Sequence, residues 1–534
     1  MTRAWTLEIA VWAVLALLSA GAMLTYKPIP LTNDGIVYLN VAEEIREGRG
    51  ISTTIVHYDT ERSHGRIPAP MTTFPPGYPF VISVWGGSES SARYISLVSF
   101  TGTAALLTWA LLFVDVPELL RLLVMLGFLT NVVSLRYATS VHSEGLFTFL
   151  AFASLVGILW TERTEDSLGI VLSCLAISVA YTVRYAGLFL IPLVVTYALV
   201  GKRRQILSAL IPLFTAAALF VRNSMIVGDW RGGNDMPISK PLSSVLGDYA
   251  RGEIHLLFGA HRFQLGVREA LLLVAASIVV AGWIVTYLVP MMQRRERLAD
   301  WRVVGILLVW ILVYTAAFVF AARTSVVDVD SRMFVPLVPC YLLVLALLLT
   351  SWRQSKILMG GLAAIVVCTA AINARDLSIP DPRTRPLVLA DLMAKPASDG
   401  RSLRQWIDAN IGVNEAIVAA DGQATAHLLG RPTVSMVPAD FSMVRWECGE
   451  IRKQMERFQA RYLILYKAFP PGSPENDDFL VEKSRFIGGT AEQQQACGFM
   501  VAEENSGVRV LRINTGYNPA VGETPTIWTP KQSP

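Results

Sequence analysis

Residues 31–50 read LTNDGIVYLNVAEEIREGRG, and residues 68–80 read PAPMTTFPPGYPF. Both segments lie in one polar stretch, Leu31 to Pro79, which directly follows the first apolar block of the chain. The stretch starts with an acidic residue, Asp34, continues as a short helical pattern and ends in a turn rich in Pro and Gly. The polar residues beside the other apolar blocks can be interpreted as partners of Asp34.

The composition is typical of a membrane protein. Of the 534 residues, 53% are hydrophobic and 16% are charged, whereas soluble chains carry about 25% charged residues. The apolar residues form blocks of about 18–23 residues, long enough to cross a bilayer as helices. The first block shows no clear cleavage site and is expected to be a retained helix. The net charge of +4 is small and dispersed, which argues against a nucleic-acid partner.

We predict a polytopic α-helical membrane protein with about eleven transmembrane helices. Their approximate ranges are 5–25, 92–114, 119–136, 143–161, 167–184, 186–200, 205–227, 268–290, 302–322, 333–351 and 356–373. Short basic connections mark the cytoplasmic side, and they occur at 202–204, at 294–297 and at Arg353 with Lys356. The N-terminus is therefore expected inside, and the C-terminus outside with the first outer loop, 26–91.

The composition divides the chain into a transmembrane domain (1–373), a linker (374–397), an extracytoplasmic α/β domain (398–515) and a flexible tail (516–534). The α/β domain combines an amphipathic helical pattern with short apolar runs that suit buried strands. It contains Cys448 and Cys497. Outside the cell these cysteines could form a disulfide, and two unpaired thiols are the alternative.

Ionisable residues beside the spans gather on one predicted face of the membrane. Because such residues are costly at membrane depth, each is a functional hypothesis. The carboxylates are Asp34 and Glu144, and the guanidinium groups belong to Arg184, Arg222 and Arg332. Arginine binds phosphate through a bidentate fork, so a cavity containing these groups suits an anionic, membrane-embedded substrate.

Each of these residues also has a structural interpretation. Asp34 and Glu144 could simply cap the helices that follow them, and the arginines could extend toward the interface. The turn at Pro75–Pro79 could be only a rigid return, or its Tyr78 could line the cavity. Asp328 and Asp330 have the spacing of a weak metal motif. No phosphate-binding Gly-rich loop is present, which argues against an ATP-driven transporter.

Several short motifs, taken in order, resemble a known superfamily. They are NDGIVYLNVAEEIREGRG (33–50), MTTFPPGYPF (71–80), HSEGLFTFL (142–150), VRYAGLFLIP (183–192), VRNSMIVGD (221–229) and DSRMFVPLVP (330–339). The pattern resembles the GT-C-fold, polyprenyl-phosphate-dependent glycosyltransferases of the protein O-mannosyltransferase and aminoarabinose-transferase type. The resemblance covers roughly residues 1–373.

The resemblance implies transfer of a sugar from a polyprenyl-phosphate donor to a lipid, glycan or protein acceptor, with inversion, on the extracytoplasmic face of the inner (plasma) membrane. It implies that Asp34 is the general base, that Glu144 is the second acid, and that Arg184, Arg222 and Arg332 hold the donor phosphate. We also assign Tyr38 and Tyr78 to substrate binding. No cofactor follows with certainty, although some relatives use a divalent cation, and no metal ligands are assigned.

A multi-pass transporter or lipid flippase is the alternative function. It predicts ionisable residues in the middle of spans and inverted repeats, whereas the charges here lie at span ends and no repeat is visible. A third possibility is an inactive relative whose C-terminal domain binds a partner.

Overall fold

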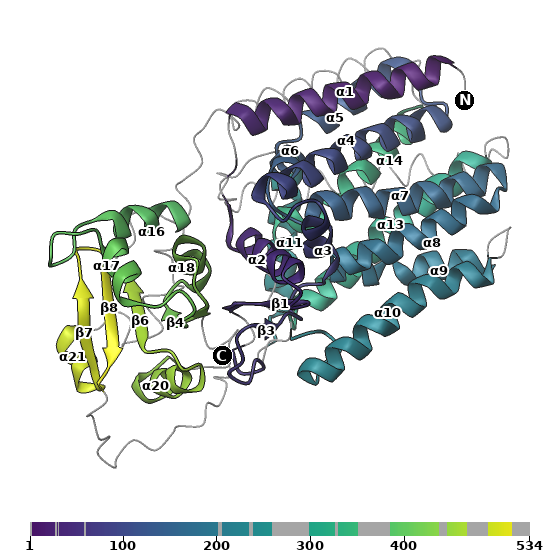
Figure 1. Ribbon diagram of the computed structural model, residues 1–534. Helices are drawn as coiled ribbons and strands as arrows, with labels where there is room; N and C mark the ends of the chain where they lie inside the picture. The colour runs from purple at the N-terminus through teal and green to yellow at the C-terminus, as the bar shows by residue number, and fades with distance from the viewer. Residues whose placement is uncertain are drawn as a thin grey trace.

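Apolar helices form a bundle, and a β-sheet with flanking helices lies beside one of its ends, as Figure 1 shows for the computed structural model. The structure describes residues 3–26, 29, 31–57, 60–200, 205–233, 239–258, 298–325, 329–350, 385–436, 446–466 and 490–514. Several predicted features lie outside these residues, namely the spans 268–290 and 356–373, the basic loops at 202–204, 294–297 and 353–356, Asp328, and the tail 516–534.

The helical part of the described chain consists of long apolar helices joined by shorter elements. In chain order they are α1 (Arg3–Tyr26), α2 (Asn33–Arg46), α3 (Gly77–Val84), α4 (Glu89–Phe113), α5 (Glu118–Leu129), α6 (Val132–Thr139), α7 (Glu144–Thr164), α8 (Ser167–Val183), η1 (Tyr185–Phe189), α9 (Ile191–Val200), α10 (Ile206–Val227), α11 (Leu242–Phe258), α13 (Leu298–Ala322), η3 (Ser331–Leu337) and α14 (Val338–Thr350).

Nine of the predicted spans fall on described helices. Six of these helices are long and apolar enough to cross a membrane, and a seventh span is formed if the bent pair α5 and α6 counts as one. The predicted span 119–136 is therefore not a continuous helix: it bends by 56° between Leu129 and Val132, where the Asn131 side chain caps α6. The predicted spans 167–184 and 186–200 are apolar helices that are shorter than the others.

Helix α7 lies at the centre of the bundle, between α4 and α8. Its contact with α8 is unusually close because glycines face each other: a Cβ atom on Gly157 would lie 2.5 Å from the carbonyl oxygen of Gly169. One turn away, Ser154 and Ser173 are joined by a hydroxyl hydrogen bond of 2.9 Å. Small and hydroxyl-bearing residues at such contacts are typical of helix packing in membranes.

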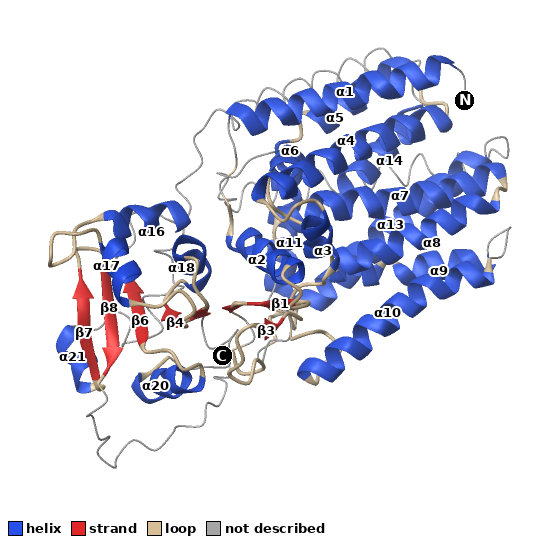
Figure 2. Cartoon of the chain, in the orientation of Figure 1, coloured by secondary structure: helices blue, strands red, loops and turns tan. Residues whose placement is uncertain are grey.

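The C-terminal part is a six-stranded sheet with helices on its faces (Figure 2). Its elements are α16 (Arg385–Ala394), α17 (Leu403–Asn410), β4 (Ile417–Ala419), α18 (Gly422–Leu429), β5 (Thr433–Ser435), α20 (Cys448–Arg457), β6 (Tyr462–Tyr466), α21 (Ala491–Ala496), β7 (Phe499–Glu504) and β8 (Val508–Ile513). The strand order is β2-β5-β4-β6-β8-β7, where β2 (Ile55–Val56) belongs to the N-terminal part of the chain. The first four strands are parallel, and β8 and β7 are each antiparallel to their neighbour. The expected fold class, a helical membrane protein with a C-terminal α/β region, is confirmed.

One edge strand of this sheet, β2, comes from the first loop of the chain. Strand β2 (Ile55–Val56) pairs with β5, with Ile55 opposite Thr433. The neighbouring strands β1 (Ser52–Thr53) and β3 (Ala69–Pro70) form a separate antiparallel ribbon, and Figure 1 shows this ribbon between the bundle and the sheet. Val56 and Ala69 are buried in the core of the C-terminal part. An ion pair of 2.7 Å between Glu61 and Arg457 adds a polar contact.

The domain boundaries stay a prediction, but part of the predicted linker packs in the core of the C-terminal part. The second half of the predicted linker contains α16, and Val388 and Leu389 of this helix are buried in the C-terminal core. The linker prediction rested on the segment ARDLSIPDPRTRP (374–386), which is rich in Pro and charged residues, and it did not weigh the apolar residues that follow.

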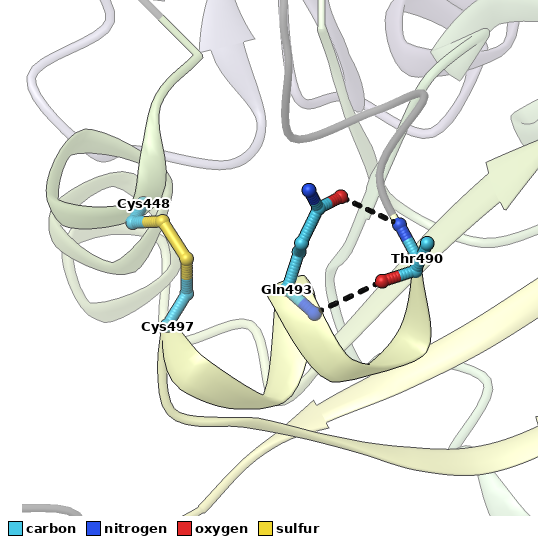
Figure 3. Close-up of a disulfide and its surroundings, with 4 residues drawn as sticks. All are labelled: Cys448, Thr490, Gln493 and Cys497. Atoms are coloured by element: carbon cyan, nitrogen blue, oxygen red, sulfur yellow. Dashed lines mark hydrogen bonds between the residues drawn. A yellow bond between two sulfur atoms is a disulfide. The ribbon is translucent and has the colours of Figure 1, made fainter.

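Cys448 and Cys497 form a disulfide, which resolves the two alternatives left by the sequence (Figure 3). It joins the start of α20 to the residue that follows α21. Helix α21 begins with a capping box in which Thr490 and Gln493 exchange hydrogen bonds of 2.9 and 3.3 Å.

Candidate active site

Helix α2 begins where Thr32 caps it, and this places Asp34 in its first turn. The Thr32 hydroxyl accepts a hydrogen bond of 3.3 Å from the backbone N–H of Gly35. The interpretation of Asp34 as the cap residue is therefore wrong. Its carboxylate is left available for a tertiary partner, while it still gains from the positive end of the helix.

Asp34 faces Arg332, which lies almost 300 residues later in the chain. The Arg332 guanidinium donates a hydrogen bond of 2.7 Å to Asp34 Oδ2. Its Nε lies 3.1 Å from Asp330 Oδ2, and Asp330 Oδ1 accepts from the Arg332 backbone N–H at 2.9 Å, capping η3. Arg332 is thus held between two carboxylates. The side chains of Asp34 and Arg332 are 22% and 25% exposed, so a ligand could reach both.

A second ion pair lies behind the first. Glu144, the first residue of α7, is buried and lies 2.7 Å from Arg184. Arg184 also donates a hydrogen bond of 3.0 Å to the hydroxyl of Ser143. Ser143 is the residue at the N-cap position of α7, so Glu144 is not the cap; its carboxylate serves as the counter-charge of Arg184. Since two buried charges need each other, this pair fixes the start of α7 against the end of α8.

The charges around Asp34 set its protonation state. Burial opposes its ionisation, but Arg332, with smaller contributions from His142 and Arg184, outweighs burial and holds the pKa of Asp34 below its usual value. Burial also lowers the pKa of His142, although the carboxylates of Glu144 and Asp34 act in the opposite direction. The His142 ring contacts the Thr32 hydroxyl at 3.1 Å and thereby supports the cap of α2.

The first ion pair opens into a cavity of about 460 Å³. Asp34, Arg184 and Arg332 form its polar end. Aromatic and aliphatic side chains of η1, α10 and α13 line most of the rest, namely Leu188, Phe189, Phe220, Ala317, Phe318, Phe320, Ala321 and Ala322. Such a cavity can hold a molecule with an anionic head and a long apolar body.

The two tyrosines assigned to substrate binding take different positions. Tyr38 lines the cavity, and its hydroxyl lies 3.2 Å from the Ser143 hydroxyl. Tyr78 is fully buried and does not line the cavity: its ring packs edge-on against Tyr38, with centroids 5.0 Å apart. Tyr78 therefore supports Tyr38 from behind, because the turn at Pro75–Pro79 directs it into the core.

Arg222 does not join the other two arginines. Its guanidinium donates a hydrogen bond of 2.7 Å to the backbone carbonyl of Met71 and another of 3.2 Å to Asn223. Arg222 is not among the described residues that line the cavity. The proximity of Arg222 to a span end, from which the prediction was made, does not specify the direction of its side chain.

Sequence reasoning missed Trp230 and Arg231, which line the cavity after α10. The Arg231 guanidinium lies over the Trp230 ring, 5.6 Å from its centroid. The only signal available in the sequence was an aromatic–basic pair in a loop.

The described residues offer no ligand set for a divalent cation. No group of three His, Cys, Asp or Glu side chains among them is close enough to hold a metal ion. Asp34 and Glu144 each face an arginine, which already supplies the positive charge.

The fold is similar to that of solved structures of ArnT from Cupriavidus metallidurans. The structure bound to undecaprenyl phosphate matches with a TM-score of 0.54 and 13% sequence identity, over 96% of this chain and 98% of that one. The apo structure matches with a TM-score of 0.48 and 14% identity, over 96% and 99%. The first of these confirms the predicted GT-C fold. No protein-family model matches the sequence, and no curated protein does.

Proposed function

We propose that this protein is an integral-membrane glycosyltransferase that moves a sugar from a polyprenyl-phosphate donor to an acceptor hydroxyl. The observation that carries the proposal is the shared cavity: Asp34 and Arg332 lie 2.7 Å apart at its polar end, and its apolar lining continues from there. The polar end matches a phosphate and an acceptor hydroxyl, and the apolar part matches a prenyl chain. Undecaprenyl phosphate, bound in the ArnT structure of the same fold, is a ligand of this class.

In the proposed reaction Asp34 is the general base. The acceptor oxygen attacks the anomeric carbon of the sugar and transfers its proton to the Asp34 carboxylate. The bond between the anomeric carbon and the phosphate oxygen breaks, and polyprenyl phosphate leaves with the bonding electrons. Because the attack comes from the side opposite the leaving group, the anomeric configuration inverts.

Arg184 and Arg332 are the proposed phosphate ligands. The negative charge of the leaving phosphate grows in the transition state, and guanidinium groups held in the wall of a largely apolar cavity stabilise it. Glu144 has a supporting role, since its buried carboxylate holds Arg184 in place. Tyr38 lines the same cavity, and its hydroxyl contacts the Ser143 hydroxyl that also accepts a hydrogen bond from Arg184.

Donor binding also activates the base in this scheme. Without donor, Arg332 neutralises Asp34 and lowers the pKa of its carboxyl, which makes it a weak base. A donor phosphate competes for the same guanidinium. As Arg332 turns to the phosphate, the pKa of Asp34 rises and the carboxylate becomes a better proton acceptor. The base is thus strengthened when the phosphate of the donor is bound.

The proposed location is the inner (plasma) membrane, with the α/β part on the extracytoplasmic side. The disulfide between Cys448 and Cys497 supports this orientation, because disulfides persist in oxidising compartments. The proposed partners are the lipid donor and a lipid, glycan or protein acceptor.

The test uses the purified full-length protein, a panel of polyprenyl-phosphate-linked hexoses and pentoses, and lipid, glycan and protein acceptors that carry a hydroxyl group, and it measures release of polyprenyl phosphate. We expect Asp34→Asn to abolish release while the protein still inserts and unfolds normally. Glu43→Gln, which removes an exposed carboxylate from the same helix, is the matched control and should keep full activity. Near-normal release by Asp34→Asn would refute the base assignment. Movement of the intact lipid across vesicles, without any release, would favour a flippase.

A further inference from the structure

Helix α11 lies outside the cavity but packs directly on η3, the segment that carries Arg332. The ring of Tyr249 meets Phe334 edge-on, with centroids 5.0 Å apart. The carbonyl of Leu256, near the end of α11, accepts a hydrogen bond of 2.7 Å from the Asn131 side chain. The helix is therefore fixed by contacts on both sides of the position where it crosses η3.

At the crossing, α11 presents a glycine to the backbone just before Arg332. A Cβ atom on Gly252 would lie 3.1 Å from the carbonyl carbon of Asp330 and 3.2 Å from the nitrogen of Ser331. These are backbone atoms, which cannot rotate away as a side chain could. Gly252 is buried, whereas Gly247 on the same helix is exposed and has open space around it.

A polar contact anchors the same turn of α11 to the bundle. The Tyr341 hydroxyl of α14 donates a hydrogen bond of 2.7 Å to the Glu253 carboxylate. Glu253 is the residue next to Gly252, so this bond sets how closely the glycine approaches Asp330. Because α14 follows η3 directly in the chain, this hydrogen bond connects α11 to the segment that carries Arg332.

We propose that Gly252 is a positioning residue for Arg332, and that α11 sets the distance between the guanidinium and Asp34. The inference rests on the proposed function, because it concerns the arginine assigned to the donor phosphate. Asp330 transmits the effect: its side chain contacts both the backbone N–H and the Nε of Arg332. A displacement of the Asp330–Ser331 backbone by a few tenths of an ångström therefore moves Arg332 with it.

The test compares Gly252→Ala with Gly247→Ala in the full-length protein. Both replacements raise the helix propensity of α11 equally, so only the contact with Asp330 and Ser331 distinguishes them. The first measurement is the rate at which phenylglyoxal, an arginine-selective reagent, modifies Arg332 relative to Arg184 in the same sample, read by mass spectrometry. The second is kcat/KM for the lipid-phosphate sugar donor.

We expect Gly252→Ala to raise the ratio of Arg332 to Arg184 modification and to lower kcat/KM about tenfold, since small misplacements of a binding group have large kinetic effects. Gly247→Ala should match the wild type in both. A modification ratio that is the same in all three proteins would overturn the inference. If the wild type releases no polyprenyl phosphate from any donor, the proposed function fails, and the modification ratio still decides this inference.

A second variant covers the case in which Gly252→Ala does not accumulate in the membrane. Tyr341→Phe removes the anchor of α11 without adding an atom. It should also raise the modification of Arg332 relative to Arg184, and an unchanged ratio would count against the inference.

Discussion

Arg332→Gln is the most informative single change in the site. It removes the cation that faces Asp34 but keeps a polar side chain. Arg332 makes a charge-assisted hydrogen bond of 2.7 Å to Asp34 and is assigned to the donor phosphate. A hydrogen bond to a charged group contributes about 1.5–3 kcal/mol, and each 1.36 kcal/mol of barrier changes a rate tenfold. We therefore expect kcat/KM for the donor to fall about 10- to 150-fold.

The same variant should change the pH dependence. Asp34 accepts a proton only when ionised, so kcat/KM falls as the pH drops through the pKa of Asp34 in the free enzyme. In the wild type, Arg332 is the largest contribution that lowers this pKa, and burial acts against it. Without Arg332 burial dominates, the pKa of Asp34 rises, and the acidic limb of the profile moves to higher pH.

The assay is release of polyprenyl phosphate by purified protein, followed as kcat/KM against pH. Arg222→Gln is the matched control, because it removes an arginine at the same end of the bundle that contacts the Met71 carbonyl and does not line the cavity. It should leave the acidic limb in place. If Arg332→Gln retains kcat/KM within about twofold, well below the expected loss, and its acidic limb does not move, the role assigned to the ion pair is refuted.

Tyr78→Phe should leave the KM for the donor unchanged, because Tyr78 is buried behind the cavity wall; an increased KM would contradict that placement. Burial raises the pKa of Glu253 to about 6, so folding favours the neutral carboxyl, and the wild type loses this stabilisation as the pH rises through 6. Glutamine stays neutral, so Glu253→Gln should be more stable than the wild type above pH 6, by up to about 2 kcal/mol. Thermal unfolding at pH 5 and pH 8 measures this, and an equal effect at both would count against it. Replacing Cys448 and Cys497 with Ser opens a loop of 49 residues, which lowers the free energy of unfolding by about 4 kcal/mol in the chain-entropy model. We expect faster proteolysis of the C-terminal part, and an unchanged proteolysis rate would contradict this prediction.

The helical part could be predicted from the sequence because apolar blocks of membrane length have few other solutions. The site was found for a related reason. Charged residues are rare beside spans, so Asp34, Glu144, Arg184 and Arg332 were conspicuous, and the structure brings them together in two ion pairs. What periodicity could not supply was the pairing itself, which depends on how distant helix ends meet.

The failures have a common physical origin. Arg222 and Tyr78 were chosen by position, but a position near a span end does not fix whether a side chain turns to the cavity, to the core or to a loop carbonyl. Thr32 was overlooked as the cap because an acidic residue two positions later fits the same rule. Strand β2 has only two residues, and its partner β5 is distant in the sequence, so no local sequence pattern predicts it.

The pairing of β2 with β5 affects the order in which the protein becomes functional during synthesis. Ile55 emerges from the ribosome early, yet its partner Thr433 follows roughly 380 residues later. At about 5–20 residues per second, the loop that carries Asp34 waits roughly 20 to 80 s for the strand that completes it. During that interval the first helices can already insert, while the loop above the cavity is unfinished. We therefore expect a chain that stalls before residue 433 to insert its first helices while β2 still lacks its partner strand.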